Sequence, residues 1–316
     1  MNNHFDVIII GGGAAGLTAG IYLSRAKLST LILNEGTVGG QMVLTHEIAN
    51  YPGIESISGY QLARNMKAQA QKFGCIIRSN LKITGIELSG DIKQITVNES
   101  DVYTSNAVII ATGGKSRTIG VPGEENLKGK GISYCATCDG DFFQDKEIIV
   151  VGGGNSALEE AVSLTKYASK VTIVHQFDHF QAFEHYVEEA KLNSKINFIM
   201  ESKIVEFIGD EKLTGVKIQN IASNEIAEMT IDGVFIFIGY VPNTEKLDGL
   251  IELNQWKEIV VDKNMATNVA GVYAAGDSIA KRYRQVTTAL ADGTIAALSA
   301  ADYLNSLKKA FIPVEV

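Results

Sequence analysis

A glycine-rich loop between an apolar strand and a helix is the feature that most constrains this fold. Residues 5–10 form a mainly apolar run rich in β-branched residues, which leads directly into the loop Gly11-Gly12-Gly13-Ala14-Ala15-Gly16. A helical stretch to about residue 26 and a second strand at 31–33 follow, ending at Glu35. Such glycines allow a tight turn and the close approach of a pyrophosphate to the helix N-terminus, and the acid can hold a ribose. The pattern predicts a dinucleotide-binding unit.

The same pattern occurs again 141 residues later (152 − 11 = 141). A strand at 147–151 runs into Gly152-Gly153-Gly154-Asn155-Ser156-Ala157, a helix to about residue 167 and a strand at 170–175. The residue equivalent to Glu35 is Gln176 (35 + 141 = 176). The second unit therefore keeps the phosphate loop but lacks the ribose carboxylate.

The order of the remaining strands indicates that the second unit is inserted into the first. A strand at 106–110 and another at 271–277, followed by a small-residue helix at 286–304, belong with the first loop. The second unit has its own closing strand at 234–238. We therefore predict an α/β fold of two nested Rossmann-like domains. The expected boundaries are 1–116 and 246–316 for the outer domain and 117–245 for the inserted domain.

Two of the three cysteines stand at CxxC spacing, in Cys135-Ala136-Thr137-Cys138. This spacing permits a small disulfide ring that opens and closes, and it is also half of a zinc site. The third cysteine, Cys75, stands alone, so a redox dithiol is favoured over zinc and no metal site is expected. Asp139 follows the pair, where a carboxyl group can move the proton of thiol exchange or simply cap a turn.

Composition excludes several classes of function. The chain has 316 residues and a formal net charge of −8, which argues against nucleic-acid binding. No apolar run approaches the ~18 residues of a membrane span, and the N-terminus lacks a basic, signal-like start. We therefore expect a cytoplasmic protein, and in that reducing compartment a CxxC pair is more often catalytic than structural.

Together these motifs resemble the low-molecular-weight thioredoxin reductases over nearly the whole chain. The motifs are Gly11-x-Gly13-x-x-Gly16, Gly39-Gly40-Gln41, Asn50-Tyr51-Pro52-Gly53, Ala111-Thr112-Gly113, Ser133-Tyr134-Cys135-Ala136-Thr137-Cys138-Asp139-Gly140, Gly152 to Ala157, Gly276-Asp277 and Tyr283-Arg284-Gln285. The resemblance implies a homodimer with FAD in the outer domain and thioredoxin as substrate. It also implies that Cys138 is the thiol nearer the flavin, with Asp139 as its acid and base.

The resemblance assigns the FAD site to residues of the outer domain, residue by residue. These are Gly11, Gly13, Ala14, Ala15, Gly16, Glu35, Gly40, Gln41, Asn50, Ala111, Thr112, Gly113, Gly276, Asp277, Arg284, Gln285 and Val286. The catalytic set is Cys135, Cys138 and Asp139.

The chain departs from the family after the second strand of the inserted domain. Members that use NADPH carry His-Arg-Arg there and a further Arg, which grip the 2′-phosphate. Here the three arginine positions hold Gln176, Phe177 and Gln181, and Asp178 adds a negative charge. A branch of the family with this appearance is ferredoxin-linked, so we rank ferredoxin first as electron donor, NADH second and NADPH third.

Two other interpretations of the whole chain remain open at this point. A non-enzymatic redox sensor would use the flavin and the dithiol only to report redox state. A ferredoxin–NADP reductase of similar fold would have no need for the CxxC pair.

Overall fold

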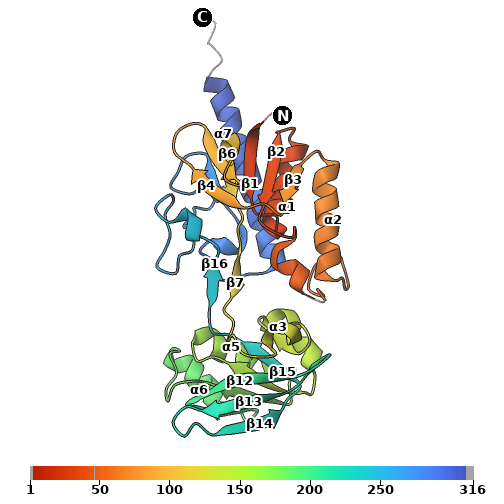
Figure 1. The fold of residues 1–316 in the computed structure, drawn as a ribbon, viewed down its shortest axis with the longest axis vertical. Coiled ribbons are helices and arrows are strands. Elements are labelled where there is room, and N and C mark those ends of the chain that lie inside the picture. Colours follow the sequence, from red (N-terminus) through yellow and green to blue (C-terminus); the bar gives the residue numbers. More distant parts are fainter. Residues whose placement is uncertain (1–2, 46, 311–316) are drawn as a thin grey trace, which may run out of the picture. The chain divides into compact units, whose positions relative to one another are not determined.

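The computed structural model describes residues 3–45 and 47–310, which form two compact units. The outer unit contains residues up to 115 and from 241 onward, and the inserted unit contains residues 116–240. The chain crosses between them on two paired strands, β7 (Gly114–Ser116) and β16 (Tyr240–Pro242) (Figure 1).

The second division lies earlier than the expected 245/246, and hydrogen bonds explain why. The backbone N–H of Asn243 donates to the Gly113 oxygen at 2.9 Å, and its side-chain amide donates to the Thr112 oxygen at 2.9 Å. Thr244 donates to the Lys257 oxygen at 2.7 Å. Residues 243–244 are therefore bonded into the outer unit.

The outer unit is built on one mixed sheet with strand order β3-β2-β1-β6-β5-β4, in which β17 also pairs with β6. The parallel strands are β1 (His4–Ile10), β2 (Thr30–Asn34), β3 (Ile76–Ser79), β6 (Asp101–Ile110) and β17 (Val272–Ala274). The strands β4 (Ile83–Glu87) and β5 (Lys93–Val97) run antiparallel to their neighbours. The isoleucine run of β1 is almost fully buried, as expected for a central strand covered on both faces.

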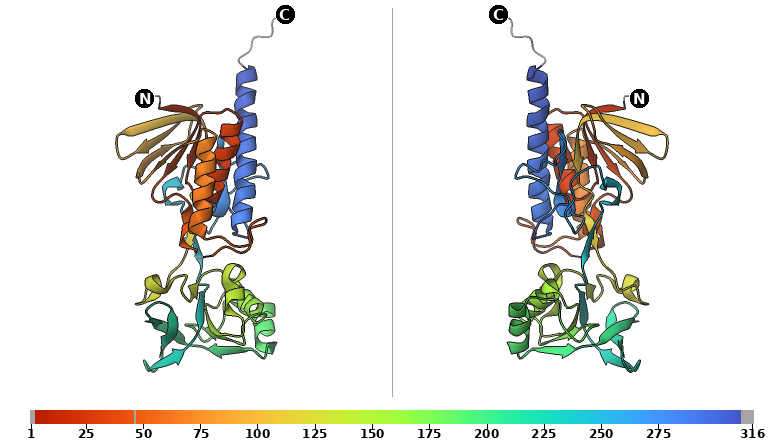
Figure 2. Two further views of the ribbon diagram at one scale, coloured as in Figure 1. Left: turned by 90° about the vertical axis from the view of Figure 1, so that its right-hand side faces the viewer. Right: turned by 90° about the vertical axis from the view of Figure 1, so that its left-hand side faces the viewer.

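Three helices lie side by side along one face of this sheet (Figure 2). They are α1 (Ala14–Arg25), α2 (Gly59–Lys72) and α7 (Val286–Ala310). Helices α1 and α7 approach closely because Gly293 has no side chain: a Cβ atom there would lie 2.3 Å from the Ala15 oxygen. Three 3₁₀ turns complete the unit, η1 (Gly40–Leu44), η3 (Glu245–Leu247) and η4 (Gly276–Ser278).

The inserted unit has a parallel sheet of order β11-β10-β9-β15-β8 and a separate antiparallel sheet of order β12-β13-β14. The parallel strands are β8 (Ile132–Ser133), β9 (Glu147–Val151), β10 (Lys170–Val174), β11 (Ile196–Ile199) and β15 (Gly233–Ile236). The antiparallel strands are β12 (Ser202–Gly209), β13 (Leu213–Asn220) and β14 (Ile226–Thr230). The helices are α3 (Glu124–Leu127), α4 (Ala136–Asp139), η2 (Gly140–Phe143), α5 (Asn155–Leu164) and α6 (Glu184–Leu192).

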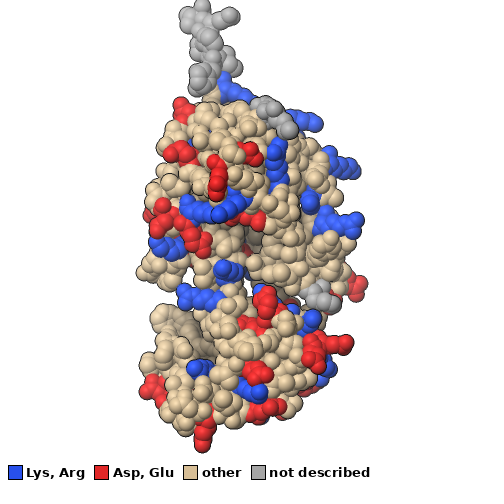
Figure 3. Space-filling view, viewed as in Figure 1, with Lys and Arg blue, Asp and Glu red and all other residues tan. Residues whose placement is uncertain are grey.

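The predicted fold class is confirmed, since each unit places a glycine-rich loop between the first strand and first helix of a parallel βαβ arrangement. Within the described residues, no helix combines the length and apolar character needed to cross a membrane. Acidic and basic side chains are interspersed over each unit on the face shown in Figure 3.

Candidate active site

The CxxC cysteines form a disulfide at the start of a short helix of the inserted unit. Cys135 immediately precedes α4, and its Sγ atom accepts a hydrogen bond from the Cys138 backbone N–H at 3.2 Å. The two sulfurs are bonded to each other, so the half-zinc-site alternative does not describe this structure. The third cysteine, Cys75, is buried, and burial raises the pKa of its thiol to about 12. Cys75 is therefore an unreactive core residue.

Asp139 lies beside this disulfide in a largely buried position. Burial raises the pKa of its carboxyl group; the Asp141 charge raises it further, and a hydrogen bond from Ser133 lowers it. Its side chain does not cap the following turn η2, which removes the alternative of a capping residue. A carboxyl group whose pKa is raised, standing next to a disulfide, is suited to give and take the proton of thiol exchange.

Ser133 is a site residue that the sequence reasoning did not identify. Its hydroxyl donates to Asp139 Oδ2 at 2.5 Å and accepts from the Cys135 N–H at 3.1 Å. The side chain is buried at the end of β8. A Ser-x-Cys sequence gives little signal of this contact, because the bond to Asp139 depends on the turn of α4.

The first glycine-rich loop packs against the end of β6, where only glycine fits. Gly11 has a φ of +108°, and a Cβ atom there would lie 2.2 Å from the Ala111 oxygen. A Cβ atom on Gly16 would lie 1.9 Å from the Gly11 oxygen. At Gly13 the nearest atom, Gly40 Cα, would be 3.9 Å away, so this face of the loop is open. No side chain caps the start of helix α1, which leaves its first N–H groups available to an anion.

Two buried oxygens beside this loop have no hydrogen-bond partner. They are Oγ1 of Thr112, at the end of β6, and Oδ1 of Asp277, in the turn η4 after β17. Burial raises the pKa of Asp277, while the charges of Lys281 and Arg284 lower it. Unsatisfied buried oxygens are uncommon in native proteins, and a bound polar molecule would satisfy them.

Lys281 is a second residue that the sequence reasoning did not identify. Its Nζ atom lies 2.6 Å from Asp292 Oδ2 and 3.6 Å from Asp277 Oδ1. Asp292 also accepts from the Gly276 N–H at 3.2 Å. The lysine thereby ties the Gly276-Asp277 turn to helix α7. Its spacing of four residues from Asp277 is the signal that could have identified it.

Two predicted cofactor residues are paired with protein groups. Glu35 accepts from the Ile83 N–H at 2.8 Å and forms an ion pair with Lys246. Arg284 forms an ion pair with Glu258. These contacts position both side chains. A ligand that bound to Glu35 or Arg284 would share that side chain with its protein partner.

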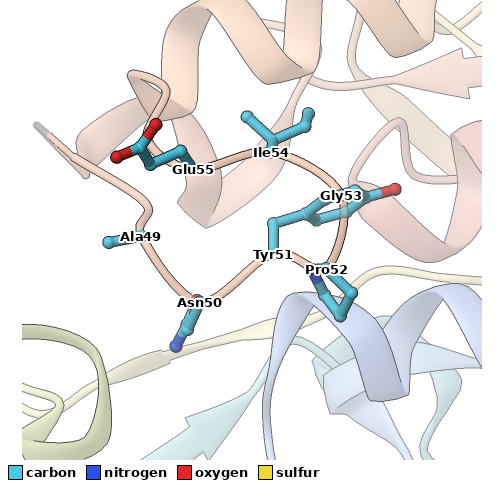
Figure 4. A pocket seen from close by; sticks show the side chains of 7 residues that line it. All are labelled: Ala49, Asn50, Tyr51, Pro52, Gly53, Ile54 and Glu55. Carbon is cyan, nitrogen blue, oxygen red and sulfur yellow. The ribbon is translucent and has the colours of Figure 1, made fainter.

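Asn50 and Gln285 come together although 235 residues separate them in sequence. The Asn50 amide donates to Gln285 Oε1 at 3.4 Å. Asn50 belongs to loop 49–55, which curves around a surface hollow of about 580 Å³, and its side chain points out from the loop (Figure 4). Among the other predicted residues, Gln41 is exposed in η1, and a Cβ on Gly113 would meet open space. Val286 begins helix α7, and Ala14 and Ala15 begin helix α1.

The glycine-rich loop of the inserted unit is in contact with an aromatic side chain. The ring of His175 lies against Gly153, so that a Cβ there would come within 2.2 Å of the imidazole. His175 stacks on Phe180 at 5.5 Å and meets Phe177 edge-on at 5.4 Å. Burial lowers the pKa of His175, so the ring is neutral and offers no charge to an anion.

The segment after β10 folds back onto the same loop. The Gln181 N–H donates to the Gly153 oxygen at 2.8 Å, and the Phe183 N–H donates to Asn155 Oδ1 at 2.8 Å. Of the positions expected to hold arginines, Gln181 is therefore bonded to the loop, and Phe177 contacts the His175 ring that lies against it. Asp178 is paired with His179 at 2.6 Å, and this contact lowers the pKa of the Asp178 carboxyl. Asp178 is therefore an exposed anion in the segment that follows β10.

Comparison with known proteins gives a consistent result. The model of the family described as pyridine nucleotide-disulphide oxidoreductase matches residues 5–293. A thioredoxin reductase of Peptoclostridium acidaminophilum is 45% identical over 313 residues, with 97% of this chain and 99% of that protein covered. A 34.2 kDa protein in a rubredoxin operon of Clostridium pasteurianum is 46% identical over 299 residues, covering 95% of this chain and 97% of that protein.

Solved structures agree with these sequence matches. The crystal structure of thioredoxin reductase from Streptococcus pyogenes superposes with a TM-score of 0.93 at 41% identity, covering 97% of this chain and all of that one. With a family model that spans most of the chain and relatives well above 40% identity, the chain belongs to the pyridine nucleotide-disulphide oxidoreductases and, within them, to the low-molecular-weight thioredoxin reductases.

Proposed function

We propose that this enzyme passes electrons from FAD through the Cys135–Cys138 dithiol to thioredoxin, and that it takes them from reduced ferredoxin. The observation that carries the proposal is the disulfide beside the largely buried Asp139, in a unit whose segment 175–181 contains no Lys or Arg for a 2′-phosphate. In the exchange, one thiolate attacks the thioredoxin disulfide and forms a mixed disulfide. The second thiol then attacks the first sulfur, restores the Cys135–Cys138 bond and releases thioredoxin as a dithiol. Asp139 is proposed to move the proton of this exchange.

The outer unit has features that suit FAD. Thr112 Oγ1 is a buried oxygen without a hydrogen bond, Asp277 Oδ1 has an ion pair with Lys281 at 3.6 Å but no hydrogen bond, and the uncapped start of α1 suits a pyrophosphate. The open face at Gly13 leaves room for a close approach of the dinucleotide. When bound, FAD supplies two-electron chemistry that can reduce an adjacent disulfide.

The electrostatics of the inserted loop support a donor other than NADPH. A hydrogen bond to a charged group contributes about 1.5–3 kcal/mol, so the loss of two or three arginine contacts weakens a 2′-phosphate ligand by several orders of magnitude. The negative charge of Asp178 and the neutral ring of His175 act in the same direction. NADH should lose less binding affinity, because the Gln176 amide can replace part of the hydrogen bonding that the missing acid would make to the ribose.

The descriptions of the relatives leave the donor open. The Clostridium pasteurianum protein is described only as a 34.2 kDa protein in a rubredoxin operon. Relatives named simply as thioredoxin reductases do not distinguish between the donors.

Anaerobic stopped-flow reduction of the flavin tests the donor. The FAD-loaded protein is mixed with reduced ferredoxin, NADH or NADPH at matched concentration, and bleaching of the flavin is followed. We expect ferredoxin to bleach the flavin and to support thioredoxin reduction. Fast bleaching by micromolar NADPH would overturn the proposal, and fast bleaching by NADH alone would establish the second candidate.

A gain-of-function variant tests the physical reason. The quadruple change Gln176→Arg, Phe177→Arg, Asp178→Ala and Gln181→Arg restores the missing cations and removes the anion. It should make NADPH a reductant of the flavin and leave the rate with ferredoxin unchanged. If NADPH remains inert, the missing cations are not the reason for its exclusion.

We also propose that the chain is a homodimer, as its resemblance to the family implies. Light scattering should give about twice the chain mass of 34.0 kDa. A monomer mass would contradict this part of the proposal.

A further inference from the structure

Ser133 lies beside the dithiol segment and has no role in the exchange described above. It is 5% exposed, at the end of strand β8, opposite Phe235 in the sheet. Its single hydroxyl connects the backbone of Cys135 to the carboxyl group of Asp139. The N–H of Cys135 donates to Oγ at 3.1 Å, and Oγ donates to Asp139 Oδ2 at 2.5 Å.

The direction of these hydrogen bonds determines what the serine can do. A hydroxyl has one proton, and two acceptors lie within reach of it, Asp139 Oδ2 at 2.5 Å and the Cys135 carbonyl oxygen at 3.3 Å. The shorter contact, to Asp139, takes the proton. The Cys135 N–H occupies an acceptor position of the oxygen and so orients the hydroxyl toward the carboxyl group. Oδ2 is thereby engaged, and Oδ1 is the oxygen left to carry the proton.

We propose that Ser133 is a positioning residue that holds the Asp139 carboxyl group against the dithiol segment and stabilises its ionised form. The inference deepens the proposed function, because it assumes that Asp139 moves the proton of the exchange. Ser133 acts on the thiols only through Asp139.

The electrostatic setting of Asp139 explains why such a residue is needed. Burial and the neighbouring charge of Asp141 both favour the protonated form. The segment also packs against helix α5 and the turn that follows it, where Gly140 contacts Leu164 and Tyr167. Among the groups that act on Asp139, the Ser133 hydrogen bond favours the carboxylate. Without it the carboxyl would hold its proton to higher pH and would be a poorer base.

Other titratable groups lie near the motif. The Tyr134 hydroxyl donates to Glu124 at 2.7 Å. On helix α5, burial and the charge of Glu159 raise the pKa of Glu160. The Asp139→Asn variant is therefore needed to separate the titration of Asp139 from that of Glu160.

Three variants separate the hydrogen bond from simple packing. Ser133→Ala removes the hydroxyl and leaves space. Ser133→Thr keeps the hydroxyl, and Ser133→Val has nearly the shape of threonine without it, so Thr and Val form the matched pair. Both are β-branched residues that suit a strand.

The first measurement is the pH midpoint at which the protonated Asp139 carboxyl disappears, read by infrared difference spectroscopy of the FAD-loaded, oxidised enzyme. The Asp139→Asn variant assigns the carboxyl band. A hydrogen bond to a carboxylate is stronger than one to a protonated carboxyl group, and the difference corresponds to roughly one pH unit. The midpoint should rise by that amount in the Ala and Val variants and stay near the parent value in the Thr variant.

The second measurement is the pH profile of thioredoxin reduction, with an artificial reductant of the flavin so that the donor does not matter. The limb that reports loss of the Asp139 proton should shift with the infrared midpoint. Equal midpoints in the Thr and Val variants, or an unshifted midpoint in both Ala and Val, would overturn the inference. An enzyme without disulfide reductase activity would refute the proposed function instead, while the midpoints would still report on Ser133.

Discussion

At the scale of single residues, the partial burial of the Asp277 carboxyl group costs the folded chain stability. One of its oxygens has no hydrogen-bond partner, and its charge is only partly offset by Lys281 at 3.6 Å. A buried charge without full pairing favours the neutral form, which is why the pKa of this group is raised. The Asp277 carboxyl group would therefore be more stable with a ligand that donates a hydrogen bond to it than with the partners the folded chain provides.

The raised pKa of Asp277 predicts how pH affects the stability of the apoprotein. A carboxyl whose pKa is raised on folding contributes stability below its unfolded pKa, and the contribution is lost as pH rises through the folded pKa. Asp277→Asn should therefore make the apoprotein more stable at neutral pH and flatten its stability profile above about pH 4, while weakening FAD binding. Thermal melts across pH and fluorescence titration with FAD would measure both. A loss of apoprotein stability at pH 7 in the Asp277→Asn variant would contradict this account.

The three cysteines should separate cleanly in function. Cys135→Ser and Cys138→Ser should each abolish thioredoxin reduction while FAD remains bound, because the exchange needs both thiols. Cys75→Ser should retain activity, since that thiol is buried in the outer unit and its raised pKa keeps it protonated. The measurement is turnover with thioredoxin, normalised to bound flavin. Residual turnover in either motif variant would refute the assignment of the dithiol.

At the scale of elements, the glycines of the first loop serve two different purposes. Gly16 makes room for protein backbone, since a Cβ there would lie 1.9 Å from the Gly11 oxygen. Gly13 faces open space, and its backbone has a φ of −80°, which any residue can adopt. The same motif therefore contains one position required by the fold and one available to a ligand.

Alanine substitutions should distinguish these two positions. Gly16→Ala should destabilise the protein by about 1–3 kcal/mol or more, because neither backbone segment can move away. Gly13→Ala should leave the melting temperature of the apoprotein unchanged but weaken FAD binding, because the added methyl group projects toward the ligand. Melting of the apoprotein and FAD titration of each variant provide the comparison. Tight FAD binding by the Gly13 variant would show that the cofactor does not pass over this face.

The elements that the sequence predicted are those with a strong local pattern. Strand β9 has the predicted bounds, and α1, β2 and β10 agree to within a few residues, because a buried apolar run followed by glycines leaves few alternatives. The strands β4 and β5 and the sheet β12-β13-β14 were not predicted. They are short or partly exposed, with a weaker hydrophobic pattern, and they are held by antiparallel pairing between segments.

The same limit applies to the candidate site. Cys135, Cys138 and Asp139 could be proposed as a site from the sequence because they lie within five contiguous residues whose side chains suit thiol exchange. Ser133 and Lys281 could not, since their partners are selected by the turn of α4 and by the packing of α7. Side-chain contacts of this kind depend on tertiary geometry that spacing alone does not supply.

At the scale of the whole molecule, the two units have separate hydrophobic cores. The outer core clusters lie on both faces of the sheet that contains β1, and the inserted unit has its own clusters on β9 and β10. Only two short strands carry the chain between the units. Each unit can therefore unfold on its own.

Calorimetry of the apoprotein should show two transitions, and FAD should raise only one of them. A ligand present at 100 times its dissociation constant stabilises the unit that binds it by about 2.7 kcal/mol. NADPH at the same concentration should move neither transition, which provides the control. A single transition that shifts as a whole would contradict the independence of the units.

The pairing of β7 with β16 has a consequence for how the chain is made. Strand β6 cannot pair with β17 until β17 has been synthesised, and β17 follows the whole insertion of 125 residues (240 − 116 + 1). Closing a flexible loop of that length would cost about 4 kcal/mol of chain entropy. Once the insertion has folded and β7 has paired with β16, the two ends lie together, and closing the outer sheet costs no more entropy than closing a tight turn. The inserted unit should therefore fold first on the ribosome, and the outer sheet should close last, when β17 and α7 emerge. Mutations that slow the folding of the inserted unit should therefore first reduce the uptake of FAD by newly synthesised chains.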